Sequence, residues 1–196
     1  MSDSQKKKPL LILDMDETLL FAIDLQDDDP SKRTPLPGRE VEFQVGDIIV
    51  YLRPHVREFL HRTSAVYDLA VWSSAGGHYV RSTISWLFDR FELPAPLFVW
   101  SSNKCTKKRD NELYYREYSV KNLKKVAKRG FDLQRMLIVD DSPEKCVANY
   151  GNAVYIKEFN GEPEDEELLH LAAYLESLAP VPNFRSVEKR GWRSRF

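Results

Sequence analysis

Short and wholly apolar runs recur along this chain, and each is followed by a polar or charged residue. A strand buried on both faces has this pattern, because none of its positions faces solvent. The runs are residues 10–13, 69–72, 97–100, 136–139 and 153–156. The segments between them carry helix signals, and the expected helices are 54–62, 77–88, 119–128, 143–148 and 164–177. This alternation predicts an α/β fold of three layers around a central parallel sheet.

One segment departs from that alternation. Residues 40–44 and 48–53 flank Val45-Gly46-Asp47 and predict a β-hairpin, inserted after the first strand and too small to be a large cap. We expect residues 1–8 to be a flexible N-terminus and residues 9–182 to form one domain. Residues 183–196 should be a basic tail, either loosely held or strapped across the surface.

Length and charge exclude several classes of protein. The chain has 196 residues, with 29 Lys or Arg and 30 Asp or Glu, and its net charge of -1 excludes a globally basic nucleic-acid binder. Its two cysteines cannot build a disulfide framework, and the apolar run after Lys6 to Lys8 is too short for a signal peptide or a membrane span. We therefore expect a cytoplasmic protein that is neither exported nor membrane-embedded.

Two of the apolar runs end in paired acids. Asp14 and Asp16 follow the first run, and Asp140 and Asp141 follow the run that begins at Met136. The carboxyl ends of parallel strands meet at one edge of a sheet, so these carboxylates are expected to converge. Each pair alone is equally well explained as a cap, but together they repel one another unless a cation lies among them. Carboxylate oxygens in this arrangement favour Mg²⁺.

Hydroxyl groups and a lysine complete the candidate site. Ser73 and Ser74 follow a third apolar run and precede the helix at Gly77, which places hydroxyl and backbone N–H groups where an anion can bind. Either serine alone is also a common helix cap. Lys121 is expected in the first turn of helix 119–128, where a lysine is ordinarily a solvated surface charge.

In this order, the motifs resemble those of the haloacid-dehalogenase-like (HAD) superfamily. They are D-x-D-x-T at residues 14–18, Ser73, Lys121 and the acid pair at residues 140–141. Segments 14–20, 52–60, 120–123 and 137–143 look more specifically like phosphatases of the RNA polymerase II carboxy-terminal domain (CTD), the NLI-interacting-factor-like branch. The similarity covers about residues 8 to 180, and the ordered series is far more specific than any single motif.

The resemblance implies a Rossmann-like HAD fold and a Mg²⁺-dependent phosphomonoester hydrolase. Asp14 would attack phosphorus to form an aspartyl-phosphate, and Asp16 would act first as acid and then as base. Ser73 and Lys121 would contact phosphoryl oxygens.

The same resemblance implies a set of metal ligands and further substrate contacts. Asp14, the main-chain carbonyl of Asp16 and Asp141 would hold Mg²⁺. Asp140 would hold a metal-bound water or Lys121. The sequence also allows the reverse assignment, with Asp140 as the direct ligand and Asp141 in the other role. The hydroxyls of Thr18 and Ser74 are further candidates for substrate binding.

The chain departs from that family in two segments that bear on substrate recognition. Residues 101–104 before Cys105 lack the arginine that the family often carries there, and the stretch between Cys105 and Lys121 is longer. Residues 104–129 hold ten Lys or Arg against three acids, which predicts either a surface that steers an anionic polymer or an ordinary solvated face. A site without a large cap suits a macromolecular phosphate, so we expect a phosphoserine or phosphothreonine protein as the substrate. The alternatives are 3′- or 5′-phosphorylated nucleic acid, a non-catalytic module that binds phosphorylated partners, and a related transfer such as phosphomutase or dehalogenase chemistry.

Overall fold

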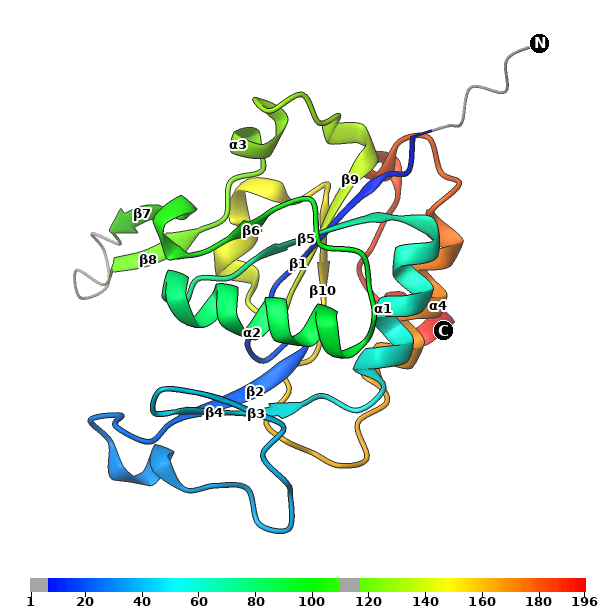
Figure 1. Cartoon of the computed structure of the whole chain (residues 1–196). Coiled ribbons are helices and arrows are strands. Elements are labelled where there is room, and N and C mark those ends of the chain that lie inside the picture. Colours follow the sequence, from blue (N-terminus) through cyan, green and yellow to red (C-terminus); the bar gives the residue numbers. More distant parts are fainter. Residues whose placement is uncertain (1–6, 110–116) are drawn as a thin grey trace.

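A five-stranded parallel sheet forms the centre of the molecule. It is seen in a computed structural model that describes residues 7–109 and 117–196 (Figure 1). The expected flexible N-terminus lies almost wholly outside the described residues. The strands, in spatial order, are β10 (Ala153–Tyr155), β9 (Met136–Asp140), β1 (Leu10–Leu13), β5 (Asp68–Trp72) and β6 (Val99–Trp100). Central β1 pairs with β5 and β9, so residues that follow β1 and β9 emerge side by side.

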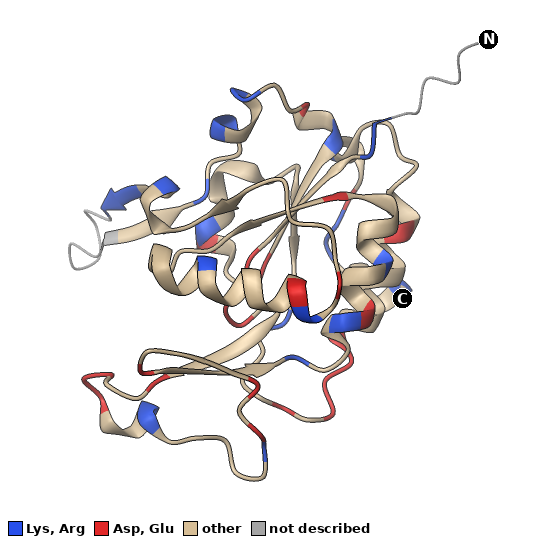
Figure 2. Ribbon diagram, in the orientation of Figure 1, with Lys and Arg blue, Asp and Glu red and all other residues tan. Residues whose placement is uncertain are grey.

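The chain leaves this sheet after β1 to form a small antiparallel sheet (Figure 1). The predicted hairpin is confirmed as β3 (Phe43–Val45) and β4 (Ile48–Leu52), but β2 (Leu20–Asp24) also pairs with β4 and was not predicted. Residues 25–42, between β2 and β3, carry five acidic and three basic residues, whereas the distant β7 strand carries basic residues and no acid (Figure 2).

The helix predicted over residues 119–128 is wrong in its first half. Residues Glu117–Val120 form strand β8, which pairs antiparallel with β7 (Thr106–Arg109). Only α3 (Lys124–Ala127) is helical, so Lys121 lies on the link between β8 and α3 and not in a first helical turn. Pairing with β7 outweighs the weak helical preference of a segment that contains Tyr118 and Val120, both good strand residues.

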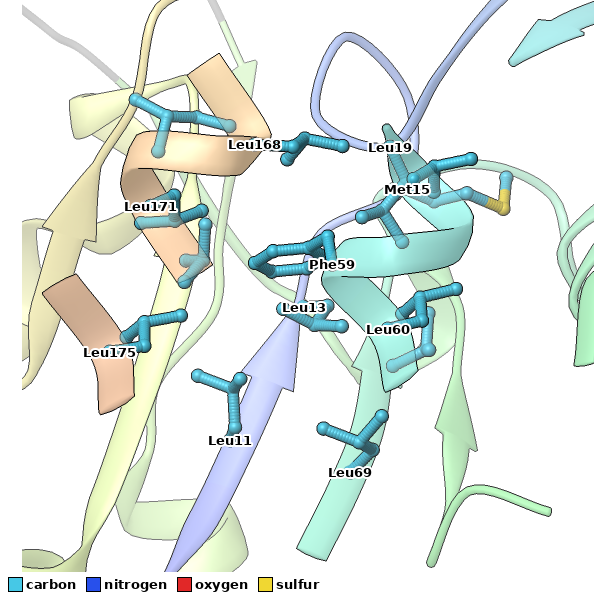
Figure 3. Packing of buried hydrophobic residues seen from close by; sticks show 14 of the residues in the cluster. Leu11, Leu13, Met15, Leu19, Phe59, Leu60, Leu69, Leu168, Leu171 and Leu175 are labelled. Carbon is cyan, nitrogen blue, oxygen red and sulfur yellow. The ribbon is translucent and has the colours of Figure 1, made fainter. Parts of the chain in front are cut away.

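The central sheet is covered on both faces, which confirms the three-layer α/β prediction. One face packs against α1 (Val56–Val66), α2 (Gly77–Arg90) and α4 (Glu167–Leu178), and the other against α3 and the 3₁₀ helix η4 (Pro143–Asn149). Figure 3 shows Phe59 of α1 and Leu171 of α4 packed around Leu13 of β1. Because both faces are buried, β1 is apolar at every position, and polar residues follow only where the strand ends.

The last residues of the chain lie across the surface as a strap. They include the 3₁₀ helices η5 (Phe184–Ser186) and η6 (Trp192–Arg195), and Trp192 is only 2% exposed. The indole ring of Trp192 stacks on Tyr174 of α4, and its Nε1 donates a hydrogen bond to the carbonyl of Tyr155. Residues 183–196 therefore lie strapped across the surface and are not loosely held. No helix in the described ranges is long and apolar enough to span a membrane.

Candidate active site

Asp14 lies at the first position after β1, buried and held in one orientation. Its Oδ1 accepts hydrogen bonds from the backbone N–H of Met15 at 2.8 Å and lies 2.7 Å from Lys121 Nζ. Its Oδ2 is 3.5 Å from Lys145 Nζ and has no hydrogen-bond partner among the described residues. Burial raises the pKa of Asp14, but the two lysines outweigh it and leave the pKa below its usual value. Asp14 is therefore a fixed anion with one oxygen that accepts no hydrogen bond from the described residues.

Lys121 lies between two carboxylates in the interior. Its Nζ is 2.7 Å from both Asp14 Oδ1 and Asp140 Oδ2, and its side chain is fully buried. Burial lowers the pKa of Lys121, but the two carboxylates more than offset this and raise the pKa above its usual value. Lys121 is thus a permanent cation of the interior and not the solvated surface charge that is usual for lysine.

Three carboxylates converge where β1 and β9 end. Oxygen atoms of Asp14, Asp140 and Asp141 lie within 4.8 Å of one another. Asp141 is half-buried and accepts hydrogen bonds from Thr18 Oγ1 at 3.3 Å and Ser142 Oγ at 2.7 Å. Carboxylate oxygens gathered this closely are the donor set that a hard divalent cation prefers, so these residues fit such a cation.

Asp16 is held by two hydroxyl groups beside this cluster. Its Oδ1 accepts from Tyr79 OH at 2.6 Å and its Oδ2 from Ser73 Oγ at 3.2 Å. Burial raises the pKa of Asp16, and the charge of Asp14 acts in the same direction. A carboxyl group with a raised pKa retains its proton more readily, as a general acid requires.

The other candidate substrate-binding hydroxyls have different surroundings. Ser73 follows β5, and its Oγ also accepts a hydrogen bond from the backbone N–H of Ala75 at 3.0 Å. The Ser74 hydroxyl lies 3.8 Å from Cys105 Sγ, whereas the Ser73 hydroxyl contacts Asp16. Thr18 is buried, and its hydroxyl orients Asp141. Substrate binding by Thr18 and Ser74 stays a prediction.

Two side chains at the site were not predicted from the sequence. Lys145 reaches Asp14 from η4, and Tyr79 reaches Asp16 from the first turn of α2. Neither directly follows an apolar run, as Asp14, Ser73 and Asp140 do, and neither belongs to the motifs that resemble the HAD superfamily. Both residues lie a few positions after a candidate motif, Tyr79 after Ser73 and Lys145 after Asp141. Closeness in sequence does not tell whether a side chain points into the site.

Arg53 ties the loop after β1 to a distant segment, and it too was missed. Its Nε and NH2 form a two-pronged ion pair with Asp165 at 2.7 and 2.8 Å. Its NH1 donates to the carbonyl of Thr18 at 3.1 Å, and its guanidinium lies 5.2 Å from the centre of the Phe159 ring. The sequence does place Arg53 directly after the apolar run at residues 48–52, where burial is expected. Because an arginine is seldom buried unless it is paired, this position could have indicated a buried ion pair.

The fold and this carboxylate cluster define a HAD-like protein of the CTD-phosphatase branch. The chain belongs to the NLI interacting factor-like phosphatase family, whose sequence model matches residues 9–185. The resemblance drawn from the motifs is therefore confirmed.

Several curated proteins are similar over most of the chain. Phosphatase Herzog of Drosophila melanogaster is 28% identical over 95% of this chain and 48% of its own length. Human carboxy-terminal domain RNA polymerase II polypeptide A small phosphatase 1 is 27% identical over 92% of this chain and 63% of its own. This chain thus spans about half the length of such relatives. The solved structure of Fcp1, an essential RNA polymerase II CTD phosphatase, matches with a TM-score of 0.62 at 15% identity, covers 89% of this chain and 63% of its own, and shows the shared fold.

The predicted cytoplasmic location is wrong. Two similar proteins carry names that place them at the nuclear envelope. CTD nuclear envelope phosphatase 1 of Xenopus laevis is 29% identical over 95% of this chain and 74% of its own. Nuclear envelope morphology protein 1 of Saccharomyces cerevisiae is 27% identical over 94% of this chain and 42% of its own. The prediction rested on reduced cysteines, which do not distinguish the cytoplasm from the nucleus or from membrane surfaces exposed to either.

Proposed function

We propose that this protein is a Mg²⁺-dependent phosphomonoester hydrolase that acts on phosphoserine or phosphothreonine in proteins through an aspartyl-phosphate. One observation carries the proposal: Asp14 is buried and anionic, and its Oδ2 has no hydrogen-bond partner among the described residues while Oδ1 is held by Lys121. A carboxylate with one oxygen fixed and the other free is arranged as a nucleophile.

In the first step, Asp14 Oδ2 forms a bond to phosphorus as the bond from phosphorus to the leaving oxygen breaks. Asp16 donates its proton to that oxygen, and the alcohol departs. In the second step, Asp16 accepts a proton from a water that attacks the aspartyl-phosphate, which releases phosphate and restores Asp14. Tyr79 and Ser73 keep Asp16 in place through both steps, because each holds one of its oxygens.

The residues proposed to hold Mg²⁺ are Asp14, the main-chain carbonyl of Asp16 and Asp141. Asp140 is already paired with Lys121, which favours Asp141 as the direct ligand of the two. When bound, Mg²⁺ supplies the positive charge that allows a dianionic phosphate to approach three carboxylates. Lys121 and Lys145 add protein-borne positive charge at the same place.

The substrate class is supported by the family and by relatives whose names specify the CTD of RNA polymerase II. These names describe those proteins, and a phosphorylated protein is the class of substrate that they have in common. No comparison supports the nucleic-acid alternative.

The test is a hydrolysis assay with p-nitrophenyl phosphate and phosphoserine peptides, with and without Mg²⁺. We expect activity that EDTA abolishes and Mg²⁺ restores, and acid-quenched protein that carries phosphate on Asp14. Asp14→Asn should lower kcat by about a thousandfold or more, whereas Asp89→Asn on the exposed face of α2 should have no effect. A protein that binds phosphopeptides but hydrolyses none in Mg²⁺ would instead establish the non-catalytic alternative.

A further inference from the structure

A basic surface lies beside the candidate active site. We define it by the lysines on and next to β7 and α3: Lys104, Lys107, Lys108, Lys124, Lys125 and Lys128. All of them are exposed except Lys125, which is half-buried. Figure 2 shows blue segments on β7, on the turn before it and on α3.

Among the described residues, the lysines of this basic surface outnumber the acids near them: Glu117, in register with Arg109, is the one acidic residue in segments 101–109 and 117–131. Segments 101–109 and 118–131 contain no Asp or Glu. Within the described ranges, no ion pair joins any of these lysines to a carboxylate. Lysines on an edge strand protect it against pairing with another chain, and this accounts for those on β7. It does not account for Lys124 and Lys128, which are on a different element.

The basic surface is connected to the site through the backbone. Lys107 is paired in register with Ser119, two residues before Lys121, whose Nζ lies 2.7 Å from Asp14. Two residues of strand span about 7 Å. Lys125 Nζ donates to the carbonyl of Lys104 at 2.6 Å, which joins α3 to the turn before β7. We therefore expect an extended peptide with its phosphate at Asp14 to come near Lys107 within a few residues.

We propose that the basic surface binds an acidic segment of the protein substrate that adjoins the phosphorylated residue. This inference rests on the proposed phosphatase function and adds a specificity to it. A peptide is favoured over a single-stranded nucleic acid, which binds by stacking its bases on exposed aromatic rings as well as by charge. Segments 101–109 and 118–131, both described by the structure, carry no exposed large apolar side chain on which a base could stack.

The experiment compares two phosphoserine peptides of equal length, one with acidic and one with neutral flanking residues. The variant combines Lys108→Glu with Lys124→Glu, and the matched control combines Arg57→Glu with Lys157→Glu, which changes the charge equally at exposed positions on other elements. We expect the first variant to lower kcat/KM for the acidic peptide about tenfold. The neutral peptide and p-nitrophenyl phosphate should be hydrolysed as before, and the control variant should match the wild type.

Equal losses on both peptides, or no loss on either, would overturn the proposal. A 5′-phosphorylated oligonucleotide that loses activity while the acidic peptide does not would also overturn it, in favour of nucleic acid. Binding of an unphosphorylated acidic peptide, measured by fluorescence anisotropy, separates this inference from the proposed function. Affinity that is lost in the first variant supports the basic surface even where no hydrolysis occurs, and unchanged affinity contradicts it.

Discussion

Single residues set the charge around Asp14. Lys121 is buried between Asp14 and Asp140 and has no freedom to move away from either. Lys145 faces the other oxygen of Asp14 at a longer distance, and its side chain is 22% exposed. Under the proposed function we therefore predict different tasks for the two lysines: Lys121 holds the carboxylates, whereas the partly exposed Lys145 contacts a phosphoryl oxygen.

Lys145→Met should weaken substrate binding more than it disturbs the fold. Loss of one charge-assisted hydrogen bond costs about 2 kcal/mol, or about thirtyfold in kcat/KM. We expect most of the effect in KM, with the temperature of unfolding nearly unchanged because Lys145 is partly solvated. Steady-state kinetics and thermal unfolding measure the two quantities. Lys121→Met is the contrasting variant, and it should lose both activity and stability, since it leaves buried carboxylates unpaired. Similar losses of stability in the two variants would contradict this division of tasks.

At the scale of elements, the Arg53–Asp165 ion pair joins the end of β4 to the segment before α4. It links residues that are 112 positions apart, and the same arginine holds the carbonyl of Thr18 in the loop after β1. Burial raises the pKa of Asp165, but the hydrogen bonds and charge of Arg53 outweigh it and hold the pKa below its usual value. The ion pair therefore joins three segments: the loop after β1, the end of β4 and the segment before α4.

Asp165→Asn should destabilise the protein by about 3 kcal/mol at neutral pH, because it leaves a buried guanidinium without its counter-charge. A lowered pKa contributes stability that is complete above the unfolded value and is lost as the pH falls through the folded one. The difference between wild type and variant should therefore shrink below about pH 4. Urea unfolding at neutral and acidic pH measures it. Glu164→Gln, at an exposed neighbouring position, is the control and should change neither curve. A difference that grows on acidification would contradict the argument.

Some strands can be predicted from the local pattern of apolar residues, and others cannot. The runs that became β1, β5 and β9 were predicted because burial on both faces makes them apolar throughout. Strand β2 was not predicted because its apolar residues directly follow the acidic motif. Strand β8 was predicted as helix because the sequence of β8 does not indicate that it pairs with β7. Short strands outside the central sheet depend on their partners more than on their own composition.

For the molecule as a whole, the C-terminal strap closes the packing around α4 and the edge strand β10. Trp192 contacts both elements, through the ring of Tyr174 and the carbonyl of Tyr155. The carbonyl of Tyr155 lies at the edge of the sheet, where its outer groups otherwise meet solvent. The strap therefore belongs to the folded domain in its energetics, although its composition is that of a basic tail.

Trp192→Ala should cost about 3 to 5 kcal/mol of folding free energy. Activity per folded molecule should be unchanged, because the strap contacts β10 and α4 and not the carboxylates. Urea unfolding followed by hydrolysis assays below the transition checks both expectations. Phe196→Ala, which removes a 40% exposed ring from the same strap, is the control and should cost much less. A Trp192→Ala protein as stable as the wild type would show that the strap is only loosely held.

The sequence alone determined which segments are buried strands and that Asp14, Asp16, Asp140 and Asp141 follow their ends. Those signals are local, because the apolar pattern of a strand and the polar residue after it lie within a few positions of each other. The resemblance already offered Lys121 as a partner of Asp140. Only the tertiary structure decided how closely Lys121 lies to both Asp14 and Asp140, that Lys145 and Tyr79 reach the site, and that Arg53 pairs with Asp165. The reason is physical: a side chain's own neighbours in sequence set its backbone conformation and burial, whereas its charge partner is set by packing between segments far apart in the chain.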